Sequence, residues 1–270
     1  MNKTARRAGA LMVAGMLSAG LGACGDDDDE AGTSNDTASE DAAADTGEFC
    51  DAAVEVDAAN MALESGESSP EDVDAAMQEA EDSAPDEIAE AVGTMVSESK
   101  ALAAEAEEAP EGEGPPPIPS DEFFAASAEV GGYLGENCDL GALDVTATEY
   151  AFDGIPEEVQ AGTTLLTFTN DGTEFHEAVL MQIAEGEERS FEELMALPEE
   201  ESMALVTNKA FVFTPPDTET YVTAELDPGR YVAICFVPTG ATPEALETGA
   251  TLDESDGHFM HGMVTEFQVT

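Results

Sequence analysis

Residues 227–236, DPGRYVAICF, decide the fold of the C-terminal half of the chain. Asp227-Pro228-Gly229 is typical of a tight turn, and the run after it is rich in β-branched and aromatic side chains up to Cys235. This pattern predicts a strand that ends at a cysteine. Further runs of this kind lie at 145–152, 163–170, 176–183, 221–226 and 263–269. Residues 141–270 are therefore predicted to form an all-β Greek-key sandwich.

Two short helical segments are predicted inside this sandwich. Ser190 and Glu193 have the spacing of a capping box, which predicts helices within residues 191–205, between two strands. A second short helix is expected at 243–247, in the acidic segment that follows Cys235.

The segment before the sandwich, residues 49–140, has apolar side chains at helical spacing and is rich in alanine and glutamate. It predicts four helices. The first covers about 49–64, and the second runs from Pro70, behind an N-cap Ser69, to Asp82. The third runs from Pro85 toward Ala109, and the fourth begins after an N-cap Ser120 and ends near Asn137. The proline-rich residues 111–120 separate the last two. The predicted fold class is thus α and β in separate domains, an antiparallel helical bundle followed by the sandwich.

Two cysteines delimit the helical bundle. Cys50 lies at the start of its first helix and Cys138 at the end of its fourth. In an up-down bundle with an even number of helices these two points share one end. We therefore expect Cys50 and Cys138 to form a disulfide, which an exported protein can maintain.

The charge balance excludes one class of partner. The chain has 61 acidic and 7 basic side chains, a formal net charge of −54. Nucleic acid binding depends on basic side chains that displace counterions from phosphates, and this chain offers almost none. We therefore expect no nucleic acid partner.

The N-terminus predicts export and anchoring. Residues 1–23 have a basic start, a short apolar run and small residues, as in a secretory signal. Leu21 to Cys24 resembles the lipobox of bacterial lipoproteins, which implies lipidation of Cys24 and a lipid anchor on the extracytoplasmic face of the cell membrane. Residues 24–48 are polar and acidic and are predicted to be a disordered tether. The alternative is an ordinary secretory signal in which Cys24 is incidental.

The metal-ligating residue types gather in the predicted sandwich. It contains all three histidines and the cysteine left over from anchoring and the disulfide. His176 lies at the start of a strand, Cys235 at the end of another, and His258 and Met263 just before the last strand. Two imidazoles, a thiolate and a weak axial thioether are the ligands of a blue copper site.

The order of these motifs resembles that of the cupredoxins, the plastocyanin-like family, over about residues 143–270. NDGTEFHEAVL is similar to the family's segment with the first histidine ligand, and PGRYVAIC to the strand that delivers the cysteine. His258 and Met263 are similar to the second histidine and the axial methionine. The resemblance implies a type 1 copper site formed by His176, Cys235, His258 and Met263, with His261 as a neighbour. The FCDA and ENC patterns of the bundle resemble helical modules of exported actinobacterial proteins.

One feature departs from the family pattern. Type 1 sites place the second histidine a few residues after the cysteine, whereas 22 residues lie between Cys235 and His258. A long loop costs little free energy to close, but it predicts a less rigid ligand set that binds copper and serves poorly as an electron carrier.

Two functions follow from these patterns. The first is a copper-binding envelope lipoprotein that transfers electrons to a redox partner or handles copper. The second is a metal-free cupredoxin-like lipoprotein that acts as a scaffold for another envelope protein. Cys235 lacks an accompanying orienting residue or oxyanion motif, so the chain is predicted not to be an enzyme.

Overall fold

The computed structural model describes residues 37–108, 118–248, 250–253 and 255–270. The predicted signal peptide, the lipidation residue Cys24 and tether residues 25–36 lie outside the described residues. Residues 38–270 form one compact unit. Within the described part of the chain, no helix combines the length and the apolar character needed to cross a bilayer.

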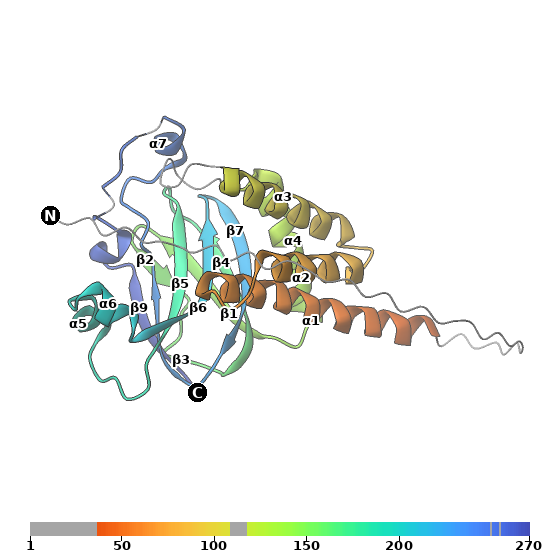
Figure 1. The fold of residues 1–270 in the computed structure, drawn as a ribbon, viewed down its shortest axis with the longest axis horizontal. Helices are drawn as coiled ribbons and strands as arrows, with labels where there is room; N and C mark the ends of the chain where they lie inside the picture. Colours follow the sequence, from red (N-terminus) through yellow and green to blue (C-terminus); the bar gives the residue numbers. More distant parts are fainter. Residues whose placement is uncertain (1–36, 109–117, 249, 254) are drawn as a thin grey trace, which may run out of the picture. The chain divides into compact units, whose positions relative to one another are not determined.

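Four helices precede the sandwich in the described chain (Figure 1), α1 Thr37–Ser65, α2 Pro70–Ser83, α3 Ala89–Glu108 and α4 Asp121–Asn137. Ser69 and Asp72 form the capping box of α2, and the Ser120 hydroxyl accepts a hydrogen bond from the Phe123 amide at the start of α4. Both caps lie where the sequence predicts them, because serine side chains satisfy the amide groups that the first helical turn leaves unpaired.

Helix α1 is longer than the sequence indicates. It begins at Thr37, so residues 37–48, which the composition assigned to the disordered tether, belong to this helix. This stretch contains four alanines, the residue with the highest helix propensity, and it continues a helix that the buried Phe49 anchors. A high content of acidic residues therefore does not by itself distinguish a disordered tether from a helix.

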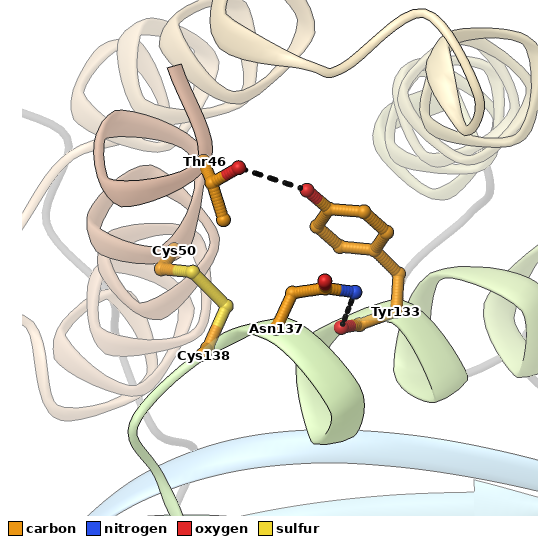
Figure 2. Close-up of a disulfide and its surroundings, with 5 residues drawn as sticks. All are labelled: Thr46, Cys50, Tyr133, Asn137 and Cys138. Atoms are coloured by element: carbon orange, nitrogen blue, oxygen red, sulfur yellow. Dashed lines mark hydrogen bonds between the residues drawn. A yellow bond between two sulfur atoms is a disulfide. The ribbon is translucent and has the colours of Figure 1, made fainter. Parts of the chain in front are cut away.

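The disulfide joins the first and the last of the four helices. Cys50 of α1 is bonded to Cys138, which caps the C-terminus of α4, and their Cα atoms are 5.8 Å apart. Figure 2 shows Tyr133 of α4 beside this link, with its hydroxyl 3.3 Å from the Thr46 hydroxyl of α1. The structure thus contains the pairing that the bundle layout predicts.

The sandwich consists of two sheets (Figure 1), one of four strands in the order β2-β1-β4-β7 and one of five in the order β3-β9-β8-β5-β6. The strands are β1 Gly141–Thr148, β2 Ala151–Asp153, β3 Glu158–Val159, β4 Gly162–Asn170, β5 His176–Ile183, β6 Val206–Thr214, β7 Thr218–Leu226, β8 Gly229–Ile234 and β9 Val264–Val269. The pairs β1–β4 and β3–β9 are parallel, and the other pairs are antiparallel. A shared apolar core, which includes Phe168, Leu180 and Tyr231, fills the space between the sheets.

The predicted run 145–152 is two strands, because the chain turns at residues 149–150 between β1 and β2. Two further strands, β3 and β6, were missed in the sequence. β3 is only two residues long, and β6 carries Asn208 and Lys209 in its first half, beside a register shift at Leu180 and Met181 of its partner. These polar residues hide the alternation that marks a strand, and β6 is at the edge of its sheet, where they are tolerated. The short helices α5 Phe191–Met195, α6 Glu199–Met203 and α7 Pro243–Glu247 lie where the sequence predicts them.

The helices pack against the sheet that ends in β7. Leu165 of β4 and Tyr221 of β7 belong to the apolar cluster that α1, α3 and α4 form. A Cβ atom at Gly131 of α4 would lie 2.8 Å from the Tyr221 ring, so only glycine permits this close approach. The sandwich and the helices therefore share one part of their apolar core.

Asp57 of α1 makes a polar contact with the same sheet. Its Oδ2 atom accepts hydrogen bonds from the backbone amide and the hydroxyl of Thr223, both at 2.7 Å. Burial raises the pKa of Asp57 to about 6, and the two bonds from Thr223 offset part of this rise. Because the folded pKa exceeds the unfolded value of about 3.9, the contribution of Asp57 to stability is complete below that value and is lost as pH rises through about 6.

We expect Asp57→Asn to stabilise the protein at pH 8 and to have little effect at pH 4. The amide oxygen still accepts from Thr223 but carries no charge to bury, and the side chain is only partly buried, so the gain should be about 1 kcal/mol rather than the full value of the shift. Urea unfolding of both proteins at the two pH values measures the difference. Equal destabilisation at both values would contradict this assignment.

Candidate metal centre

His176 is the first residue of β5 and is completely buried. The Asn170 side chain shapes the connection that precedes it, because its Oδ1 accepts from the Gly172 amide at 2.8 Å and its Nδ2 donates to the Glu174 and Thr214 carbonyls at 2.8 and 3.0 Å. An asparagine that bonds to its own turn in this way is a common device for a tight reversal. These bonds hold the backbone of the connection before β5 in place and thereby fix the position of His176.

Cys235 follows the last residue of β8 and is also completely buried. Its sulfur accepts a hydrogen bond from the Glu177 amide of β5 at 3.5 Å. Its backbone amide donates to the Met263 carbonyl at 3.2 Å, and its carbonyl accepts from the Phe259 amide at 3.0 Å. The cysteine is therefore tied to both segments that carry the predicted histidine ligands.

His258 begins the 3-10 helix η1, His258–His261, and its side chain is completely buried. Residues 237–239 and 256–258 pair with each other, and we call this pair of segments the neck. The His258 amide donates to the Val237 carbonyl at 2.9 Å, and the Thr239 amide donates to the Asp256 carbonyl at 2.9 Å. Pro238 and Gly257 form a β-bridge at the same place.

We call residues 239–256 the insert. Because its two ends are paired, its length does not determine how far apart Cys235 and His258 lie. The expectation of a loosely held ligand set is therefore not met in the structure. The neck brings the residues just after Cys235 next to those just before His258, as a short loop between the two ligands would.

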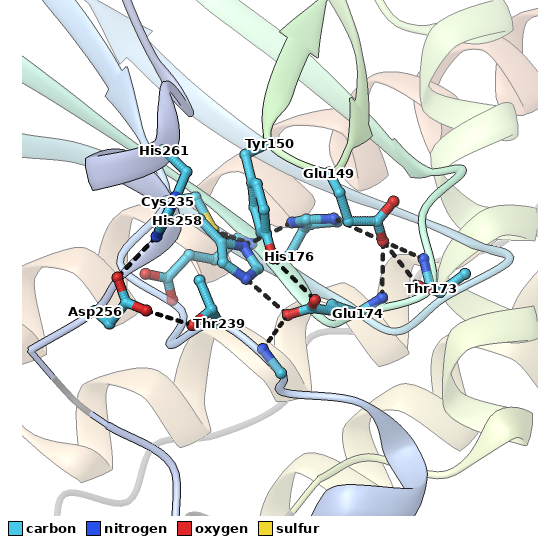
Figure 3. A network of polar contacts seen from close by, with 12 residues as sticks. Glu149, Tyr150, Thr173, Glu174, His176, Cys235, Thr239, Asp256, His258 and His261 are labelled. Atoms are coloured by element: carbon cyan, nitrogen blue, oxygen red, sulfur yellow. Dashed lines mark hydrogen bonds and ion pairs between the residues drawn. The ribbon is translucent and has the colours of Figure 1, made fainter.

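The three predicted strong ligands converge on one point. Nδ1 of His176 is 3.1 Å from Nδ1 of His258, and the Cys235 sulfur is 3.4 Å from the latter atom. One ligand atom from each residue lies within 4.8 Å of the others. Two imidazole nitrogens about 2.0 Å from one ion, at an angle of about 100° to 120°, are about 3.1 to 3.5 Å apart. Figure 3 shows the two rings and the sulfur grouped in this way.

The other two candidates lie beside this group. Met263 is completely buried, and its backbone amide donates to the His258 carbonyl at 3.2 Å, next to its bond with Cys235. His261 is exposed, its ring lies 5.1 Å from the Tyr150 ring, and its Nε2 is 2.7 Å from Oδ1 of Asp256. Its place outside the buried group agrees with the prediction that it is a neighbour, whereas axial ligation by Met263 stays a prediction.

Burial dominates the electrostatics of the ligand group. It lowers the pKa of His176 to about 4 and also lowers the pKa of His258, and it raises the pKa of the Cys235 thiol to about 12. Near neutral pH the imidazoles are therefore uncharged and able to donate lone pairs, while the thiol keeps its proton until a metal replaces it.

The hydrogen bonds around the two rings show that this group suits a cation. Nε2 of His258 is 3.1 Å from Oε2 of Glu174, which places the proton on that nitrogen and leaves the Nδ1 lone pair facing the site. Nε2 of His176 is buried and, among the described residues, has no hydrogen-bond partner; Oε1 of Glu149 is 3.9 Å away.

Each tautomer of His176 thus leaves a defect. A proton on Nδ1 leaves the buried Nε2 lone pair unsatisfied, and a proton on Nε2 sets two Nδ1 lone pairs against each other at 3.1 Å. A cation that accepts both Nδ1 lone pairs and the sulfur removes the second defect. The donor set, two imidazoles and a thiolate, suits copper.

Three residues around the site were not predicted from the sequence. Glu149 accepts from the Thr173 hydroxyl and the Glu174 amide, both at 3.1 Å, and the Tyr150 ring packs 4.7 Å from the His258 ring, measured between centroids. Glu174 contacts His258 itself. Glutamate is too frequent in this chain to mark a site, and the one available signal was that Glu174 lies two residues before His176.

No protein-family model matches the chain, and no relative is found among curated proteins. Several solved structures of copper proteins are similar to it. An auracyanin from the photosynthetic bacterium Roseiflexus castenholzii is 21% identical, with a TM-score of 0.29, over 48% of this chain and 96% of that chain. Auracyanin A, a "blue" copper protein from Chloroflexus aurantiacus, is 21% identical, with a TM-score of 0.28, over 48% and 98%. Rusticyanin from Thiobacillus ferrooxidans is 16% identical, with a TM-score of 0.29, over 48% and 77%.

The assignment of the fold depends on the chain's own geometry. Two facing sheets enclose one core, and the connections at one end of the sandwich bring together two histidines and a cysteine in the predicted order. Residues 141–270 are therefore a cupredoxin-like domain with a buried His176, Cys235 and His258 group that suits type 1 copper.

Proposed function

We propose that this protein binds one copper ion at His176, Cys235 and His258, with Met263 as a weak axial ligand, and that it carries electrons at the cell envelope. The observation that supports the proposal most is the meeting of two Nδ1 atoms and one sulfur in a buried site where neither tautomer of His176 is satisfied. Bound copper would supply one-electron chemistry, because the thiolate favours Cu(I) and the imidazoles accommodate Cu(II).

Electron transfer is favoured over copper storage by the way the ligands are held. The segments that carry Cys235 and His258 are joined by backbone hydrogen bonds and by the Pro238–Gly257 bridge, none of which involves a ligand atom. Ligands held by the backbone in this way should move little between the two oxidation states, which lowers the energy needed to reorganise the site. A storage site has no such requirement.

The proposed place of action is the extracytoplasmic face of the membrane. A diacylated Cys24 would anchor the chain in the lipid. A redox protein of the envelope is the proposed partner. The rival function, a metal-free scaffold, predicts that the purified protein neither takes up copper stoichiometrically nor changes colour with it.

A copper titration tests the proposal. We expect residues 25–270 to bind one Cu(II) per chain with intense visible absorption from thiolate to copper, which His258→Ala should abolish. His261→Ala is the matched control, because it removes an imidazole three residues away that is exposed and lies outside the ligand group. Equal loss in both variants, or a titration without the absorption band, would contradict the proposed site.

A further inference from the structure

Glu174 contacts three separate segments around the ligand group. It lies in the connection between β4 and β5, and its side chain is only 12% exposed. One carboxylate oxygen accepts from the Tyr150 hydroxyl at 3.1 Å. The other faces Nε2 of His258 at 3.1 Å and accepts from the Gly240 amide at 2.5 Å. Figure 3 shows this carboxylate at the centre of the polar network.

We infer that Glu174 is a positioning residue that fixes the insert and the ring of His258 in the geometry for metal binding. The inference about the ligand ring rests on the proposed function, whereas the contact with the insert does not. Glu174 does two separate things here: it selects the tautomer of His258, and it holds the first turn of the insert.

The selection of the tautomer follows from the acceptor character of a carboxylate. Oε2 of Glu174 accepts from the Gly240 amide and faces Nε2 of His258, so Nε2 donates to it and the Nδ1 lone pair of His258 faces the ligand group. Such partners orient metal-bound histidines, and their loss typically weakens metal binding about 10-fold to 100-fold. Tyr150 keeps the carboxylate in place and covers the His258 ring from one side.

The hold on the insert follows from the bond to Gly240. This amide belongs to the insert, and the next residue, Ala241, accepts a second bond, from the Phe175 amide at 2.8 Å. Glu174 and Phe175 together therefore attach the insert to the connection that positions His176. The segment that carries the first histidine thus orders the segment that leads to the second.

Two substitutions test the charge and the length of the Glu174 side chain separately. Glu174→Gln keeps the size but offers one acceptor oxygen and an amide group that donates. Glu174→Asp keeps the charge but is shorter by one carbon–carbon bond, about 1.5 Å. Glu185→Gln is the matched control, because it removes one negative charge at an exposed position away from the site.

The first measurement uses metal-free protein, residues 25–270, and NMR. We expect the Gly240 amide to exchange with solvent at least about tenfold faster in Glu174→Gln and Glu174→Asp than in wild type, with no change in Glu185→Gln. The nitrogen shifts of the His258 ring should report one tautomer in wild type and a mixture in Glu174→Gln. Unchanged exchange and an unchanged tautomer in both Glu174 variants would overturn the inference.

The second measurement uses the copper-loaded protein. We expect Glu174→Gln to bind Cu(II) at least tenfold more weakly and to shift its EPR spectrum toward that of a tetragonal site, with Glu185→Gln like wild type. A wild-type affinity and spectrum in Glu174→Gln would overturn the role toward His258. If wild type itself bound no copper, the proposed function would fail, and the exchange of Gly240 would still decide whether Glu174 holds the insert.

Discussion

Cys235→Ser should abolish the thiolate-to-copper absorption and lower copper affinity by at least about 100-fold. This loss is larger than the one usually seen when a residue that hydrogen-bonds to a metal ligand is replaced. Serine has almost the shape of cysteine, so the buried position is refilled and the sandwich should keep its secondary structure. The Glu177 amide, which donates to the sulfur, can donate to the new hydroxyl. The loss should therefore be specific to metal binding.

The same variant should remove the pH dependence of copper binding. Burial raises the pKa of the Cys235 thiol to about 12, so at pH 7 the metal-free site holds a proton that copper must displace. The histidines contribute little in this range, because burial lowers the pKa of His176 to about 4 and also lowers that of His258. Wild-type affinity should rise about tenfold per pH unit between pH 7 and 9.

Competition titrations at three pH values, with circular dichroism of each sample, check both statements. The control is Cys50→Ala with Cys138→Ala, which removes two cysteines and leaves the ligand group intact. If the copper affinity of wild type did not change with pH, the thiolate would not be a ligand of the metal. An intact visible band in Cys235→Ser would place the ligand elsewhere.

Removal of the disulfide should have the second large effect, on stability rather than on copper. The bond between Cys50 and Cys138 closes a loop with a sequence separation of 88 residues. The chain-entropy estimate for such a loop is about 4 to 5 kcal/mol, through restriction of the unfolded state. We expect the double alanine variant to lose about 4 kcal/mol of unfolding free energy.

Urea unfolding of the double variant, beside wild type with and without a thiol reductant, measures this loss. Reduced wild type should resemble the double variant, since both lack the same link. The visible copper spectrum should not change, because both cysteines belong to the helical segment. A loss below 1 kcal/mol would show that the shared apolar contacts with the sheet, at Leu165 and Tyr221, hold the helices without the disulfide.

Much of the local structure could be predicted from sequence because each signal acts over a few residues. Ser69, Ser120 and Ser190 cap the helices that follow them, and Asp227 and Pro228 precede β8, which begins at Gly229. The order of His176, Cys235 and His258 along the strands likewise predicted a common ligand group. The prediction was wrong for the first half of β6, which is polar, and for the start of α1, which is acidic and rich in alanine.

The sequence by itself determined which elements form and which residues offer lone pairs to a metal. Only the tertiary structure decided how those residues are held, because the controlling contacts join distant segments: Pro238 pairs with Gly257 to close the insert, and Glu174 reaches Tyr150, Gly240 and His258. A glutamate in a chain with 61 acidic residues carries no mark of such a role. Its effect depends on burial and on distances, which exist only after the sheets have packed.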